Sequence, residues 1–108
     1  MFNKKTFEWK IMAELNEIIH QPVRLRIMAA LVSLKPDDEV EFTYLRDLLS
    51  VTDGNLGAHL RKLEDAGYIA INKTFIERKP RTYISATSEG RKIFREHVAV
   101  LQSILKSK

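Results

Sequence analysis

The chain has 108 residues, of which 44% are hydrophobic and 30% are charged, and its formal net charge at pH 7 is +4. This composition excludes a disordered chain and indicates one domain with a packed core, while the positive charge suits a polyanionic partner. The absence of cysteine excludes disulfides and thiolate metal sites. Because no apolar run is long enough to span a membrane, we expect a cytoplasmic protein with no membrane partner.

The first expected element is an amphipathic helix over residues 5–19. Its apolar stripe repeats at helical spacing through Phe7, Ile11, Leu15 and Ile18. A terminal helix with this much apolar surface needs more cover than a small domain supplies. We therefore expect residues 1–20 to form a dimerisation helix that packs against a second copy of the chain.

A second helix is expected to begin at Pro22, because proline fits the first helical turn, where its missing N–H costs nothing. It should run to about Leu34 and be followed by a polar loop over residues 35–39. Residues 40–42 indicate a very short strand, and Thr43 is expected to cap the next helix. That helix should turn three leucines inward: Leu45, Leu48 and Leu49.

The segment 52–67 is expected to form the helix around which the chain is organised. Thr52 or Asp53 can cap its start, and Gly67 can close its end in a left-handed turn. The opposite face is small, polar and partly basic. The apolar stripe consists of leucines at helical spacing: Leu56, Leu60 and Leu63.

After Gly67 the pattern changes to that of a β-hairpin. Residues 68–75 and 81–86 are rich in β-branched and aromatic side chains, and the polar residues 76–80 form the expected tip. Thr87 is expected to cap a last helix, which would make residues 87–108 the second dimerisation element. Its residues expected at the dimer interface are Phe94, Leu101, Ile104 and Leu105.

Two short helices followed at once by a hairpin with a basic tip predict a winged helix. The fold is then mainly α with a small β-hairpin, an α+β fold with extra N- and C-terminal helices. Its core spans residues 21–86 of a single domain, 1–108. Three segments strengthen this prediction because they resemble, in order, motifs of the MarR/ArsR-like winged helix-turn-helix transcriptional regulators: HQPVRLRIM (20–28), NLGAHLRKLEDAGYI (55–69) and RKPRTYISATSEG (78–90).

The resemblance, which covers roughly residues 18–94, implies a sequence-specific regulator that binds double-stranded DNA. We expect a homodimer on a pseudo-palindromic site, acting as a repressor. The second helix of the pair, residues 52–67, would be the recognition helix and would enter the major groove. The hairpin, residues 68–86, would be the wing and would lie along the phosphates. Candidate DNA contacts on the recognition helix are Asn55, Ala58, His59, Arg61 and Lys62. Candidate DNA contacts on the wing are Lys73, Arg78, Lys79 and Arg81.

The charges of the recognition helix and the wing indicate different roles for them in DNA binding. Residues 53–66 carry one more acidic than basic side chain, whereas the wing, Glu77 included, has an excess of three positive charges. The wing should therefore supply most of the attraction to phosphate, and the helix should choose the sequence. Gly57 stands where the resembling helices often have serine, and Gly54 and Gly57 favour close approach of the backbone to DNA.

Several interpretations stay open at this point. His59 either faces DNA or packs as a half-buried side chain, and Arg24 and Arg26 either contact phosphate or serve in capping and salt bridges. His20, His59 and His97 are too scattered for a metal site. No catalytic arrangement is found, so we expect neither an enzyme nor a cofactor. The alternative function is a protein-interaction module without a specific DNA site, and a small-molecule effector is left open.

Overall fold

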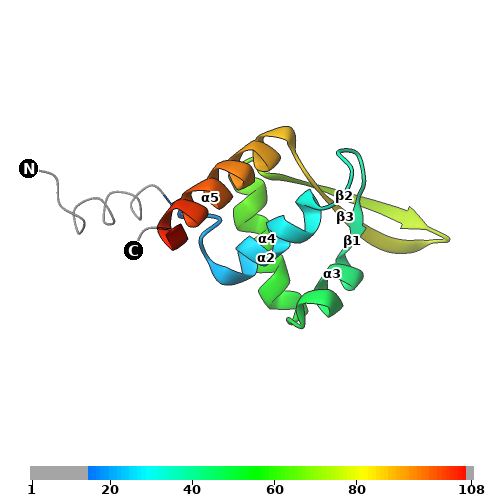
Figure 1. The fold of residues 1–108 in the computed structure, drawn as a ribbon. Helices are drawn as coiled ribbons and strands as arrows, with labels where there is room; N and C mark the ends of the chain where they lie inside the picture. The colour runs from blue at the N-terminus through cyan, green and yellow to red at the C-terminus, as the bar shows by residue number, and fades with distance from the viewer. Residues whose placement is uncertain (1–14, 107–108) are drawn as a thin grey trace, which may run out of the picture.

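The structure is a computed structural model that describes residues 15–106. The strands form one antiparallel sheet in the order β1–β3–β2 (Figure 1). The architecture confirms the predicted α+β winged helix, with α3 and α4 as the helix-turn-helix. In chain order the elements are α2 (Pro22–Val32), β1 (Val40–Glu41), α3 (Phe42–Leu49), α4 (Asp53–Asp65), β2 (Ile69–Ile76), β3 (Lys79–Ala86) and α5 (Ser88–Lys106).

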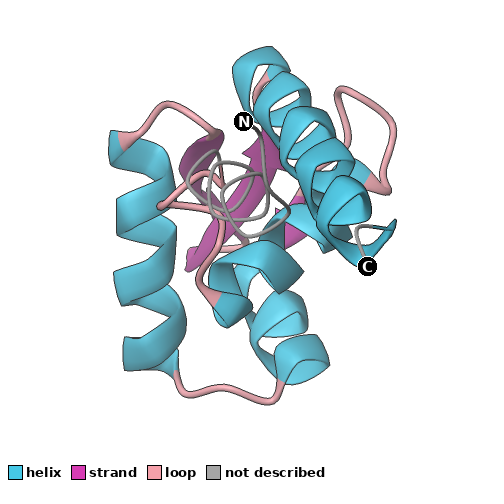
Figure 2. Ribbon diagram, turned by 60° about the vertical axis from the view of Figure 1, so that its left-hand side comes forward, coloured by secondary structure: helices cyan, strands magenta, loops and turns pink. Residues whose placement is uncertain are grey.

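Helix α2 lies at the centre of the packing, since it contacts α3, α4, α5 and β3. In Figure 2 the strands lie among the helices, so that the helices and the sheet share one core. The leucine stripe predicted for α4 is the side that this core buries. Its largest fully buried side chains are Ile19, Ile27, Met28, Leu31, Leu45, Leu56, Leu63 and Ile84.

Helix α4 has the predicted signals at both ends. The Asn55 N–H donates to Thr52 Oγ1 at 3.1 Å, which caps the start. At the other end Gly67 adopts a φ of 81°, in the left-handed region. The Tyr68 N–H then reaches back to the Leu63 carbonyl at 3.0 Å, as in a Schellman motif. The helix is therefore bounded by local chemistry that the sequence displays.

Thr87 caps α5 as predicted and also ties it to the recognition helix. Its Oγ1 accepts from the Gly90 N–H at 2.9 Å and donates to the Gly67 carbonyl at 2.7 Å. Its own N–H donates to the Tyr68 carbonyl at 3.1 Å. The start of α5 is thus joined to the turn that follows α4.

The start of α3 corrects two predictions. The helix begins at Phe42, so the strand is shorter than expected, and Glu41 rather than Thr43 holds the N-cap position. No side chain caps this end; Thr43 Oγ1 instead donates to Glu41 Oε1 at 2.7 Å. The helix starts early because β1 ends after pairing Val40 and Glu41 with β3.

Leu48 is a further correction in α3. Leu45 and Leu49 are buried as predicted, but the Leu48 side chain is 54% exposed. Residues four apart lie on one side of a helix, and Leu48 falls on the flank of that side. A helix of eight residues against this core buries one narrow stripe only.

The helix predicted over residues 5–19 is wrong for the part that the structure describes. Residues 17–20 form a turn, and the Asn16 Oδ1 caps it by accepting from the N–H groups of Ile18 and Ile19. Asn16 Nδ2 also donates to the Tyr68 hydroxyl at 3.0 Å. This turn sends Ile19 into the core instead of continuing a helical stripe.

The β2–β3 hairpin projects away from the helices (Figure 1), and its strands extend further than predicted. The expected five-residue tip, 76–80, is wrong because Ile76 pairs with Lys79. Only Glu77 and Arg78 form the turn, with φ of 52° and 67°. Two positive φ angles are typical of a type I′ turn, whose twist matches that of the strands.

Candidate nucleic-acid interface

The outer face of α4 is open along its length. Neither Gly54 nor Gly57 is required by packing, since a Cβ at either position would meet nothing within 4 Å of it in the described chain. Their small size leaves room for another backbone to approach the helix closely. The exposed side chains among those predicted for this helix are Asn55, Ala58, Arg61 and Lys62.

His59 is half-buried and held by helix α2. Its Nδ1 lies 3.2 Å from Nη1 of Arg24, whose Nε donates to the Ile18 carbonyl. Burial lowers the pKa of His59, and the charge of Arg24 lowers it further. The ring is therefore neutral near pH 7 and can accept from Arg24. This arrangement matches the packing interpretation of His59, and it shows Arg24 bonded to a carbonyl of the 17–20 turn.

Arg46 fixes α3 against α4, a role that the sequence analysis missed. Its Nη1 donates to Asp53 Oδ1 at 2.9 Å, and its Nε donates to Asp47 Oδ1 at 2.9 Å. The hydrogen bond to Asp53 is the largest cause that raises the pKa of Arg46, and the hydrogen bond to Asp47 raises it further. The pair with Asp53 also offsets one negative charge at the start of the recognition helix. A spacing of seven residues across a turn is no recognisable pattern, so the sequence contained no signal for it.

The wing cations are not equivalent. Lys73, Arg78 and Lys79 are exposed, whereas Arg81 is half-buried. The Arg81 Nη1 donates to Glu41 Oε1 at 3.1 Å, which ties β3 to β1. Arg81 therefore ties the wing to β1. Arg78 and Lys79 lie at the tip, and Lys73 lies one pair further from the tip than Arg81.

A shallow groove of about 650 Å³ runs between α4 and the wing. Arg61 of α4 and Lys73 of β2 both line it, so each side carries a basic side chain, and Glu64 lines the α4 side as well. The recognition helix and the wing thus form one continuous concave surface. Its remaining lining residues are Phe42, Gly57, Leu60, Ile71 and Thr82.

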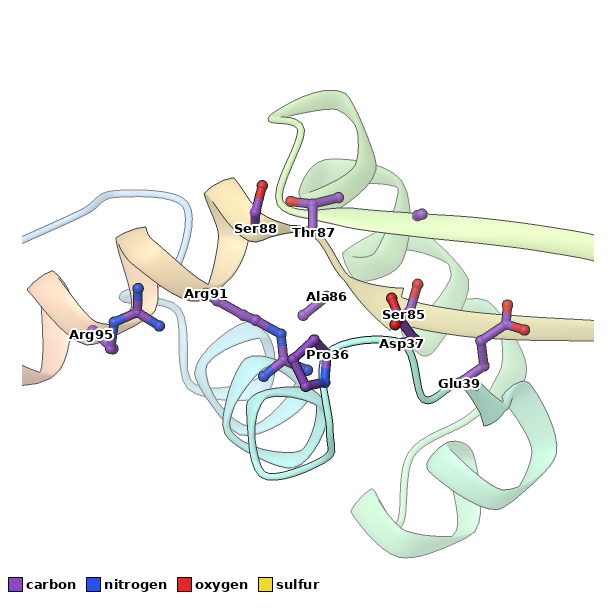
Figure 3. Close-up of a pocket in the computed structure, with 10 residues that line it drawn as sticks. Pro36, Asp37, Glu39, Ser85, Ala86, Thr87, Ser88, Arg91 and Arg95 are labelled. Carbon is purple, nitrogen blue, oxygen red and sulfur yellow. The ribbon is translucent and has the colours of Figure 1, made fainter.

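A second hollow lies between the start of α5 and the loop that follows α2 (Figure 3). Arg91 reaches from α5 toward Pro36 in this view, and Arg95 lies one turn further along the helix. The Arg91 guanidinium already donates to backbone carbonyls at the end of α2. This hollow is therefore built around a structural contact.

The residues predicted for the dimer interface differ in their exposure. Phe7 and Ile11 lie outside the described residues. Ile18 and Phe94 are half-buried against the chain's own core, while the Leu105 side chain is 74% exposed. Partial exposure is shared by the others: Leu15, Leu101 and Ile104.

His97 is the buried polar residue of α5, with 2% of its surface exposed. Its Nδ1 accepts from the Asn16 N–H at 3.3 Å, and its Nε2 has no partner among the described residues. The His20 ring lies 5.9 Å away between centroids. Burial lowers the pKa of His97, and His20 lowers it further. The ring is thus a neutral packing group of the core.

These two histidines predict a loss of stability at mildly acidic pH. The folded-state pKa values of His97 and His59 lie below the ordinary 6.5, so the unfolded state binds protons first. Their contribution is complete above 6.5 and decreases as the pH falls through that value. Urea unfolding at about pH 7.5 and about pH 5.5 should show the decrease, and His97→Gln should make it smaller. An undiminished decrease in that variant would contradict the assignment.

The described residues contain no cluster of three or more His, Cys, Asp or Glu side chains that could hold a metal ion. Between residues 15 and 106 no helix is both long and apolar enough to cross a membrane.

A helix-turn-helix followed by a basic hairpin defines a winged-helix protein. A family model described as "Winged helix DNA-binding domain" matches residues 23–105, and the chain belongs to this family. The chain is 35% identical over 91 residues to the uncharacterized protein MJ0432 of Methanocaldococcus jannaschii, a match that covers 84% of this chain and 96% of the relative.

Solved structures agree with this assignment. A transcriptional regulator homologue from Pyrococcus horikoshii is 32% identical, with a TM-score of 0.77 over 91% of this chain and 93% of that one. A MarR-family regulator from Enterococcus faecalis has the same fold at 21% identity, with a TM-score of 0.66 over 95% and 86% of the two chains. The family model thus places the chain with winged-helix DNA-binding proteins, as the resemblance implied, and the likeness to the MarR-family structure is one of fold.

Proposed function

We propose that the chain is a sequence-specific transcriptional regulator, a homodimer that represses by occupying a pseudo-palindromic promoter site. The observation that carries this proposal is the continuous surface of α4, groove and wing, with exposed Arg61 and Lys62 at one end and Arg78 at the other. An exposed helix face fits the major groove, and a hairpin beside it fits the adjacent backbone and minor groove.

The division of labour follows from which side chains are exposed. Asn55 and Lys62 offer an amide and an ammonium group to base edges, while His59 is engaged with Arg24. Lys73, Arg78 and Lys79 supply the charge that releases counterions from phosphate. We therefore assign base choice to the recognition helix and most of the affinity to the wing.

The dimer is proposed from the end of α5. Leu101 and Ile104 are only half-buried and Leu105 is exposed, so this helix retains an apolar side along its last turns. A second copy of the chain would cover that side and place two recognition helices about one DNA turn apart. Repression then needs no further domain, because a dimer on a promoter excludes other proteins from it.

The test is a titration of fluorescent duplexes of about 30 base pairs, selected from a random pool by the full chain, at about 50 and about 200 mM salt. We expect steep salt dependence and two chains per duplex. Arg78→Ala with Lys79→Ala should reduce the salt slope by about 4 and weaken binding at low salt at least about tenfold, because two phosphate contacts are lost in each of the two chains.

A charge-matched control is available on α5. Lys92→Ala with Lys106→Ala removes the same charge from exposed positions away from α4 and the wing, and it should leave the salt slope nearly unchanged. Equal effects of the two double variants would mean that net charge alone drives binding. Wild-type binding with neither salt dependence nor duplex preference would favour the protein-interaction alternative.

A further inference from the structure

The tip of the wing is apolar as well as basic. Phe75 is 75% exposed and Ile76 is 45% exposed, and Pro80, opposite Phe75 in the sheet, is exposed too. An exposed aromatic ring contributes little to the core of its own chain, and clustered apolar groups on a surface mark contact sites. The proposed function rests on basic side chains and makes no use of these apolar ones.

Strand register shows which way Phe75 and Pro80, the apolar pair of the tip, face. Side chains alternate along a strand, so alternate pairs of the hairpin share one face. On one face the pairs, from base to tip, are Ile71 with Ile84, Lys73 with Thr82, and Phe75 with Pro80. The first of these pairs includes buried Ile84, and Lys73 and Thr82 line the groove against α4. Phe75 therefore continues the side of the wing that faces the recognition helix.

The backbone holds this pair in place. Ile76 and Lys79 flank the two-residue turn, and Phe75 and Pro80 form the next pair along the ladder. In such hairpins the pair next to the turn exchanges hydrogen bonds and the following pair does not, so a proline without an N–H is tolerated there. The Phe75 ring is thus presented by paired strands and not by a loop.

The charge around the tip selects its partner. Lys73, Arg78 and Lys79 surround the apolar pair, with Glu77 as the one acid of the turn. A purely apolar protein groove would leave these cations unpaired, whereas duplex DNA places phosphates on both sides of a narrow groove. Phenylalanine and proline are among the side chains that enter the minor groove and unstack a base step.

We infer that Phe75, backed by Pro80, is a wedge that enters the minor groove beside the recognition site and bends the duplex. The inference rests on the proposed function and adds to it a contact that charge does not provide. Lys73, Arg78 and Lys79 contact the flanking phosphates while the ring lies against a partly unstacked base step. Flexible pyrimidine–purine steps are deformed most easily, so the wedge also contributes to site choice.

The experiment uses the full chain and the same selected duplex, labelled at both ends so that energy transfer reports its bend. Phe75→Ala should weaken binding of the dimer about a hundredfold, the value of one base–aromatic stack lost in each chain, and abolish the bend. Its salt slope should equal that of the wild type, because no charge is removed. Phe75→Leu keeps an apolar wedge and should retain part of both the affinity and the bend.

The outcomes separate the wedge from the proposed function. Wild-type affinity and wild-type bend in Phe75→Ala would overturn the wedge while leaving a DNA-binding regulator in place. Failure of the wild type itself to bind any duplex would overturn both. If Phe75→Ala turned a sedimenting dimer into a monomer, the tip would contact a second copy and the wedge would be wrong. Since the ring is exposed, an unchanged circular-dichroism melting curve should accompany the variant.

Discussion

Gly90→Ala is expected to lower the free energy of unfolding by about 3 kcal/mol, the upper range for overpacking a buried site. A Cβ at this position would lie 2.0 Å from the carbonyl oxygen of Tyr68 and 2.8 Å from its carbonyl carbon. Backbone atoms cannot rotate out of the way as side chains do. Helix α5 would have to move, which would break the bond from the Thr87 N–H to the same carbonyl.

The matched control is Gly57→Ala, in the other long helix of the domain. A Cβ at Gly57 would meet nothing within 4 Å of it in the described chain, so alanine there should raise stability by up to about 1 kcal/mol through helix propensity. Chemical denaturation of both variants measures the difference. A Gly90→Ala protein that unfolds at the wild-type midpoint would show that α5 does not approach Tyr68 this closely.

Arg91→Met is expected to cost about 2 to 3 kcal/mol, since several charge-assisted hydrogen bonds are lost together. The Arg91 guanidinium binds the carbonyls that end α2: Nη1 donates to Val32 at 3.2 Å, and Nη2 donates to Leu34 and Lys35 at 3.1 Å. The last carbonyls of a helix have no partner within it and carry the negative end of its dipole. Arg91 therefore acts as a C-cap supplied by another helix.

Arg95→Met is the control for this prediction, because Arg95 is exposed one turn further along α5 and lines the same hollow. It should change the free energy of unfolding by less than about 0.5 kcal/mol. Arg91→Lys should fall between the two, since an ammonium group keeps the charge without the planar fork. Similar denaturation midpoints for Arg91→Met and Arg95→Met would contradict the cap.

Local chemistry explains which parts of the fold were predictable. The leucine stripe of α4, its Thr52 cap, its Gly67 terminus and the Thr87 cap of α5 are all specified within a few residues, and the structure contains each of them. The start of α3 was not predictable in this way. Where β1 ends depends on its pairing with Tyr83 and Ile84, far along the chain, and no local pattern displays that pairing.

The candidate interface was also predictable only in part. The outward face of α4 follows from its buried stripe, so most of its exposed residues could be named from the sequence. The contacts that hold the interface in shape could not. Arg46 with Asp53, Arg24 with His59 and Arg81 with Glu41 each join two elements. A single sequence shows that such charges exist, but their partners are set by how the helices and strands pack.

The tight turn at the wing tip has a consequence for the entropy of association. A loop of five free residues would lose about 1 to 2 kcal/mol of backbone freedom per residue on contact with DNA. Here folding has already ordered all but Glu77 and Arg78 into the ladder, at a cost of left-handed backbone in two non-glycine residues. In the proposed complex the wing is therefore preorganised, and little of the contact energy is consumed in ordering it.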